Sequence, residues 1–261
     1  ADLHQRTSKD EPKLGLTILL SALDVAIAFK HNDVARLLIA ARASMKGGLG
    51  PTSHAACHYD NAEGVRLLCE NGSDPYAKNL FGTDSLENAA GYGAKAVVQE
   101  LLRQKQPSPM QLSQALHGAM VTRGGSAELV HHLVCLRANV DHQSDSFRDL
   151  SRLGRFVFGL HALKHRIGRK TELSACAYHK DGRTPLMAAL QMAQYEAAAA
   201  LIAAGARLDA RNARGFTARD FAGDWQSLPN FLQSGLEGER ADCERVSSLA
   251  LTDDSIIEMR V

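Results

Sequence analysis

The chain is poor in aromatic residues, which make up 5% of its 261 residues, and Trp225 is its only tryptophan. With few bulky rings to fill a thick core, the sequence predicts many thin, closely packed layers rich in alanine and leucine. An excess of charge of one sign is also lacking, because 30 basic residues nearly cancel 29 acidic ones. We therefore expect no overall field that would draw the chain to nucleic acid or to an anionic membrane.

Long apolar runs and an even set of cysteines are missing too. No stretch approaches the roughly 18 consecutive apolar residues of a membrane helix, and the best candidate, residues 14–29, is broken by Ser21 and Asp24. The five cysteines are odd in number and widely spaced, which fits a reducing compartment better than a disulfide framework. No signal peptide is visible, although the chain begins at Ala1 as a trimmed fragment would. We expect an intracellular, cytoplasmic protein.

A repeat of about 33 residues is clearest in residues 181–209. Thr184 can cap a helix that starts at Pro185, where the missing N–H costs nothing. A second short helix follows, and Gly205 supplies the backbone freedom needed just past its end. The cycle opens again at Thr217, 33 residues after Thr184. The segment thus predicts a pair of short helices followed by a turn.

Four earlier segments follow the same plan with decreasing fidelity, at residues 21–39, 51–68, 83–102 and 114–141. Near the start of the second helix, four of the five units carry a carboxylate, which the helix dipole favours; these are Asp33, Glu63, Glu128 and Glu196. Recurrence at this spacing, with two helices per period, is typical of a solenoid in which each unit buries its apolar face against the next.

The unit Asp181-Gly-Arg-Thr-Pro-Leu-Met-Ala-Ala-Leu190 closely resembles the ankyrin repeat, whose motif is Thr-Pro-Leu-His-x-Ala-Ala, then Glu-Val-Val-x-Leu-Leu-Leu, then Gly-Ala-Asp-x-Asn. The resemblance implies an all-α solenoid of about seven helix-turn-helix repeats, including one degenerate repeat and terminal caps. We expect a lead-in at 1–17, the solenoid at 18–234 with a C-terminal cap at about 214–234, and a partly extended tail at 235–261.

The degenerate repeat is expected at about 144–180, because residues 149–170 lack the motif but keep apolar residues at helical spacing. These apolar residues are Leu150, Leu153, Val157, Leu160, Leu163 and Ile167. We expect them to be buried between neighbouring repeats, so that the stack continues through this segment.

The resemblance also implies a non-catalytic scaffold or adaptor that binds a partner protein through its concave surface, as a module or subunit of a larger assembly. One candidate surface is a stripe of bulky residues at the ends of the first helices: Phe29, Tyr59, Tyr92 and Met192. Such side chains give large contact area at low entropy cost. The alternative is that each ring covers the neighbouring repeat.

The turn tips supply further candidates, which are Lys78, Asn79, Phe81, Tyr178, His179, Lys180, Arg183, Arg211, Asn212, Arg214 and Phe216. The tip from Tyr178 onward is basic, which favours an acidic segment of a partner; the alternative is an ordinary solvated loop. Residues 148–170 hold seven basic residues and one acidic residue, so an adaptor for anionic lipid or phosphate is the alternative function. Nothing in the segment predicts nucleic-acid binding.

Metal binding and catalysis find little support. Helical spacing puts His54, Cys57 and His58 on one face, but a structural zinc site needs four ligands and no fourth is nearby. The sequence has no phosphate-binding loop of the Gly-x-x-x-x-Gly-Lys type, no Gly-x-Ser-x-Gly elbow and no dinucleotide fingerprint. We therefore expect no enzyme activity, no metal and no cofactor.

Overall fold

The computed structural model describes residues 6–11, 16–47, 50–122 and 124–251, with side chains from residue 20 onward. One hairpin of two strands, β1 (Arg6–Glu11) and β2 (Leu16–Ser21), precedes a long series of helices. The helices are α1 (Ala22–Ala28), α2 (Asn32–Ala40), α3 (Ser53–Cys57), α4 (Ala62–Glu70), α5 (Ser85–Tyr92), α6 (Lys95–Gln104), α7 (Pro109–Thr122), α8 (Ala127–Cys135), α9 (Ser146–Asp149), α10 (Arg152–Arg166), α11 (Glu172–Tyr178), α12 (Pro185–Gln191), α13 (Tyr195–Ala203), α14 (Ala218–Phe221), the 3-10 helix η1 (Trp225–Ser227), α15 (Asn230–Leu236) and α16 (Ala241–Ala250).

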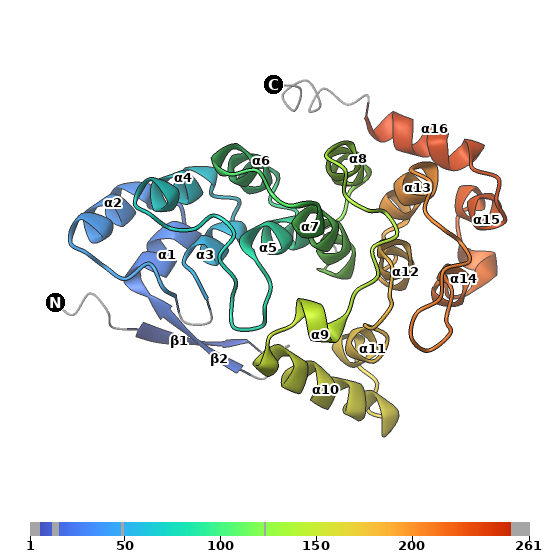
Figure 1. Cartoon of the computed structure of the whole chain (residues 1–261), viewed down its shortest axis with the longest axis horizontal. Helices are drawn as coiled ribbons and strands as arrows, with labels where there is room; N and C mark the ends of the chain where they lie inside the picture. Colours follow the sequence, from blue (N-terminus) through green and yellow to red (C-terminus); the bar gives the residue numbers. More distant parts are fainter. Residues whose placement is uncertain (1–5, 12–15, 48–49, 123, 252–261) are drawn as a thin grey trace.

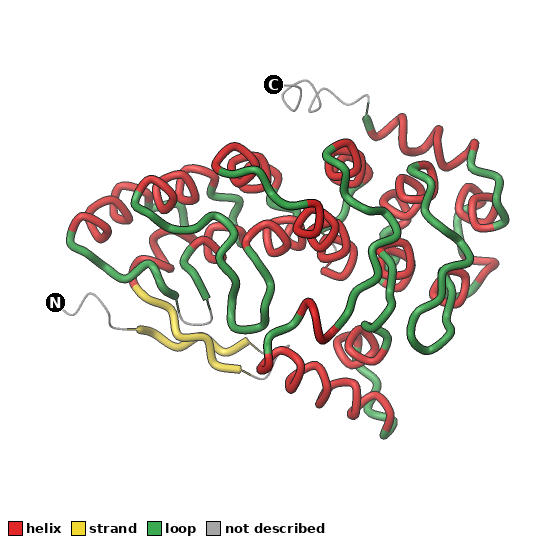
Figure 2. The backbone as a smooth tube through the Cα atoms, viewed as in Figure 1, coloured by secondary structure: helices red, strands yellow, loops and turns green. Residues whose placement is uncertain are grey.

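The helices form two rows, and the predicted all-α solenoid is confirmed. The first helices of the pairs, α1, α3, α5, α7, α12 and α14, contact one another in that order. The second helices run along the other side, where α2 packs on α4, α4 on α6, α8 on α13 and α13 on α16 (Figure 1). Figure 2 shows the turns that connect successive pairs along one edge of the stack.

Local sequence explains why each pair forms where it does. The Thr184 hydroxyl accepts the Met187 N–H at 3.3 Å, and Pro185 is the first residue of α12. Gly205 has a φ of +93° just past α13, the left-handed conformation that glycine tolerates. Between the rows the core consists mainly of leucine and alanine, and the alanines of residues 197–200 are buried. Small side chains allow the short helices to approach closely, as the scarcity of aromatics predicts.

The expected degenerate repeat does not join the stack. Helix α7 packs directly on α12, and α8 packs directly on α13, although residues 145–180 lie between them in sequence. The Gly125 N–H donates to Gln194 Oε1 at 3.0 Å across this junction. Residues 145–180, here called the insertion, therefore leave the stack at one turn tip and return to the same tip, where the Gly182 N–H donates to the Ser144 carbonyl at 2.8 Å.

Both ends of the stack differ from the expected lead-in and tail. In place of a simple lead-in, β1 and β2 pair in antiparallel register from Arg6 opposite Ser21 to Glu11 opposite Leu16. After residue 235 we expected extended chain, but α16 forms and packs on α13, with Cys243 fully buried. The apolar and small residues of α16 recur at helical spacing, and this closes the last unit. The remainder of the tail, residues 252–261, lies outside the described residues.

No helix in the described part of the chain combines the length and the apolar character that a membrane crossing requires.

Candidate partner-binding surfaces

An exposed row of aromatic rings lies at the ends of the first three first-row helices. Phe29 follows α1, Tyr59 follows α3 and Tyr92 is the last residue of α5, and the three side chains are 53%, 48% and 52% exposed. The ring centroids of Phe29 and Tyr59 lie 5.0 Å apart. The Tyr92 ring lies 4.3 Å from the ring of His58, which neighbours Tyr59 in the chain. We call Phe29, Tyr59 and Tyr92 the aromatic row.

Met192 does not extend the aromatic row. It caps the end of α12 and is 9% exposed, and the Cys176 thiol of the insertion lies 3.9 Å from its sulfur. The insertion therefore covers this position, which in an uninterrupted stack would face solvent as Phe29 and Tyr59 do.

The first turn tip is partly covered by the insertion as well. The Asn79 side-chain oxygen accepts the backbone N–H groups of Phe81 and Thr83 at 2.9 and 3.1 Å, so Asn79 holds the shape of the turn. Phe81 is buried, and its carbonyl accepts the Ser151 N–H at 2.9 Å. Of the three residues predicted here, Lys78 alone is exposed.

The second and third tips are attached to each other. The Arg214 guanidinium lies 3.6 Å from the ring centroid of Tyr178, and its Nε donates to the Tyr178 carbonyl at 2.6 Å. The His179 ring lies edge-on against Phe216, with centroids 4.8 Å apart. Burial lowers the pKa of His179 to about 4, so this ring is neutral at physiological pH. These groups act mainly within the molecule.

Two predicted tip residues are interior. Arg183 is 2% exposed, and its Nη1 donates to Gln191 Oε1 at 2.8 Å. Asn212 is 5% exposed and orders its own turn by accepting the N–H groups of Arg214 and Phe216. The expectation that both contact a partner is wrong, because the tips pack against the insertion and against each other. Arg211 stays exposed.

Beneath the insertion lies a group of polar residues that the sequence did not reveal. Gln114 of α7 donates to the Asp149 carboxylate at 3.1 Å. Burial raises the pKa of Glu87, on α5, to about 8, against the opposing effect of the positive charge of Lys180. Burial also lowers the pKa of His117 well below its usual value. The insertion thus covers the face of α5 and α7 that in a plain stack would be open.

The apolar stripe of the insertion is exposed, contrary to expectation. Leu153, Leu160, Leu163 and Ile167, which we expected to be buried between repeats, are between 44% and 65% exposed, and Phe156 lies among them at 64%. The reason is that α10 lies outside both rows of the stack, at the lower edge of Figure 1. Only its opposite face is covered, by α11.

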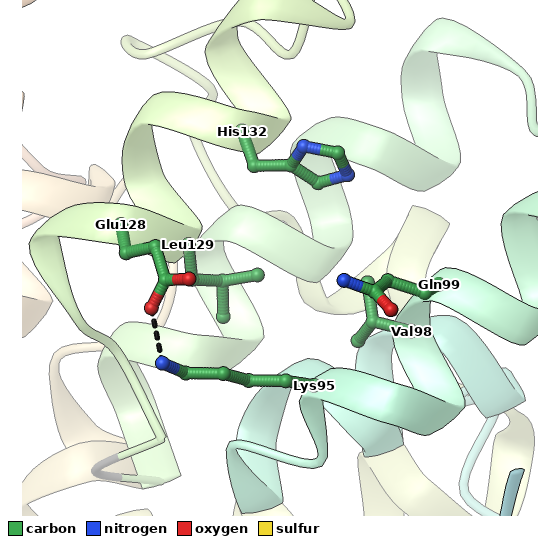
Figure 3. Close-up of a pocket in the computed structure, with 6 residues that line it drawn as sticks. All are labelled: Lys95, Val98, Gln99, Glu128, Leu129 and His132. Carbon is green, nitrogen blue, oxygen red and sulfur yellow. Dashed lines mark hydrogen bonds and ion pairs between the residues drawn. The ribbon is translucent and has the colours of Figure 1, made fainter. Parts of the chain in front are cut away.

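Two hollows among the described residues differ greatly in size. One, lined by α6 and α8, has a volume of about 10 Å³, enough for about one water. Figure 3 shows its lining, with the Lys95 ammonium in contact with the Glu128 carboxylate. A wider hollow of about 330 Å³ is lined by Gly125 and residues 193–197, at the loops between paired helices.

The residues considered for zinc are committed to other partners. The Cys57 thiol is buried and donates to the Ser53 carbonyl at 3.5 Å, and burial raises its pKa to about 12. His54 Nε2 lies 3.1 Å from the Ala77 carbonyl, away from Cys57. Among the residues that the structure describes, no three histidine, cysteine or acidic side chains are grouped so as to hold a metal ion.

Comparison with known proteins agrees with the repeat pattern. The family model for the ankyrin repeat matches residues 54–80 and 181–213. The ankyrin repeat domain of Bcl-3, a member of the IkappaB protein family, is 19% identical, with 90% of this chain and 88% of that chain covered and a TM-score of 0.54. An ankyrin repeat domain from Acinetobacter baumannii AYE is 16% identical, with 87% and 96% covered and a TM-score of 0.52. No curated protein matches the sequence significantly.

Proposed function

Because this chain is an ankyrin-repeat protein, we propose that it binds a partner protein through the aromatic row, as a non-catalytic adaptor module or a subunit of a larger assembly. Ankyrin repeats are generally protein–protein interaction modules, since a stack of helix pairs leaves a long free flank. The row crosses the first three repeats of that flank, so a partner would contact several repeats at once.

The observation that carries the proposal is the exposure of three neighbouring rings in a chain with few aromatics. Phe29, Tyr59 and Tyr92 are each about half exposed, so about half of each side chain remains in contact with solvent. Aromatic side chains dominate binding hot spots because they remove a large rigid surface from water at little cost in side-chain entropy.

The proposal is tested by replacing Phe29, Tyr59 and Tyr92 together with alanine. We expect capture of a partner from a lysate of the producing cells, followed by mass spectrometry, to fall by about tenfold or more, as loss of hot-spot residues does. Replaced singly, each ring should lower the free energy of unfolding by no more than about 1.5 kcal/mol, because about half of its area is already exposed.

Leu249→Ala on α16 is the matched control, since Leu249 is also exposed but lies at the other end of the stack. It should leave capture unchanged. A loss of about 3 kcal/mol or more from a single replacement would show that the ring is part of the core. Undiminished capture by a folded triple variant would remove the aromatic row as the binding surface.

A further inference from the structure

The exposed stripe of α10 has the geometry of a helix-pairing seam. Its five members are Leu153, Phe156, Leu160, Leu163 and Ile167, with Ile167 as the C-cap residue. The spacing alternates between three and four residues, and at about 100° per residue the five side chains fall within roughly 80° of the helix circumference. We call these five residues the apolar seam.

The seam is held in place by the rest of the molecule. The Ser151 hydroxyl caps α10 by accepting the Gly154 N–H at 3.0 Å, and the Ser151 N–H donates to the Phe81 carbonyl. On the opposite side, the His165 ring stacks on Tyr178 of α11 with centroids 4.6 Å apart. With its start attached to the stack and its rear face packed, α10 presents the seam outward without further ordering.

Charge restricts what can cover the seam. Residues 150–171 contain no acidic side chain and six basic ones: Arg152, Arg155, Lys164, Arg166, Arg169 and Lys170. Helical geometry puts Arg152 and Arg166 on one flank of the seam and Lys164 on the other. A second copy of this helix would bring like charges together, which costs free energy. The complementary occupant carries carboxylates beside its own apolar stripe.

The width of the seam favours a helix as that occupant. An alternation of three and four is the period of a two-stranded coiled coil, in which each apolar side chain fits between four residues of the facing helix. A strict stripe of this spacing is the narrow seam of a coiled coil, and a helix that lies in a membrane surface keeps its basic residues on the polar face opposite the lipid, whereas the rear half of α10 is occupied by α11. An isolated exposed leucine needs no explanation, but five adjacent large apolar residues mark an interaction site.

We infer that α10 is a second docking surface, which pairs with an acidic amphipathic helix of a partner protein. This surface is separate from the aromatic row and does not depend on it. Acidic residues of the partner helix would face Arg152, Lys164 and Arg166, and its apolar stripe would cover the seam. The acidic partner segment that the turn tips suggested thus finds its complement on α10.

The experiment measures binding of the full chain to two synthetic helical peptides of about three heptads. Both peptides carry leucine at the seam positions; one has glutamate at the flanking positions and the other lysine, and fluorescence anisotropy reports binding. We expect the acidic peptide to bind at least about tenfold more tightly at low salt, with the difference shrinking as salt screens the flanking charges. The double variant Leu160→Gln/Leu163→Gln should lose this binding while remaining folded, because both side chains are exposed.

Two further variants sharpen the result. Arg152→Glu/Arg166→Glu should shift the preference toward the lysine peptide, which a purely hydrophobic contact would not do. Leu249→Gln, exposed on α16, should leave binding unchanged. Replacing Phe29, Tyr59 and Tyr92 should not affect peptide binding either, so that failure of this inference and failure of the proposed function are distinguishable.

Three outcomes would overturn the inference. The first is equal affinity for the two peptides. The second is that neither peptide binds while the chain co-sediments with phosphatidylserine vesicles, and that this co-sedimentation depends on Leu160 and Leu163. Helix α10 would then be a lipid-binding helix. The third is a dimer in sedimentation velocity that Leu160→Gln/Leu163→Gln dissociates, which would make a second copy the occupant.

Discussion

Removing the insertion is the sharpest test of the architecture. In the variant we consider, two glycines replace residues 145–180, so that Ser144 leads directly into the tip at Asp181. The backbone already pairs at this point, since the Gly182 N–H donates to Ser144 and the Ser144 N–H donates to the Arg183 carbonyl at 3.1 Å. A two-residue loop is a common length for such a hairpin. We expect the shortened chain to keep the complete stack.

The cost in stability follows from what the insertion covers. Phe81 and Met192 would become exposed, and each loses about 1.5–3 kcal/mol of burial free energy. Closing a loop of two residues in place of about 36 returns about 2.5 kcal/mol. The net loss is then about 0.5–3.5 kcal/mol, below the 5–15 kcal/mol that typically stabilises a domain. The contacts between α7 and α12 and between α8 and α13 are retained.

Urea unfolding followed by circular dichroism and by fluorescence of Trp225 would measure the result. The helical signal should fall only by the 4, 15 and 7 residues of α9, α10 and α11. Trp225 reports on the last unit of the stack, so coincident transitions by the two probes would show that the stack still unfolds as one. Separate transitions, or a loss of helix beyond these three helices, would refute the direct junction between α7 and α12.

The remaining predictions concern single residues. Glu87→Gln should remove a pH dependence of the unfolding free energy. Because the pKa of Glu87 in the folded protein is raised to about 8, the native protein loses stability as pH rises through that value, and between pH 6.5 and 9 it should lose about 2 kcal/mol more than the variant. Urea titrations measure these losses, and equal losses for the two proteins would contradict the prediction. Thr184→Ala should lower the unfolding free energy by about 1 kcal/mol, whereas Thr184→Ser should not, because the hydroxyl caps α12. Exposed Cys135 should react with a thiol reagent in the native protein, and Cys57 only after unfolding; fast native labelling of Cys57 would oppose the buried, high-pKa site.

The repeat architecture could be predicted because the residues of each unit determine the structure of that unit. Each unit carries its own cap, apolar face and closing glycine, as Thr184 and Gly205 illustrate, and stacking follows from the period. The path of residues 145–180 could not be predicted in the same way. The spacing of Leu153, Leu160 and Leu163 indicates a helix with an apolar stripe, but the same spacing suits a buried helix and an exposed one. A signal was present: Ser144 joined to Asp181 completes an ordinary turn tip, which identifies the intervening residues as an insertion.

The same insertion explains why some of the predicted site residues are buried and others exposed. In a plain repeat, the tips that hold Phe81 and Arg183 project into solvent, and the sequence motif gives no reason to expect otherwise. The insertion starts and ends at one of these tips and packs over the others, so both side chains become interior. The aromatic row, which the insertion does not reach, is exposed. In place of the covered tips, the insertion exposes the apolar seam of α10 with basic residues on both flanks.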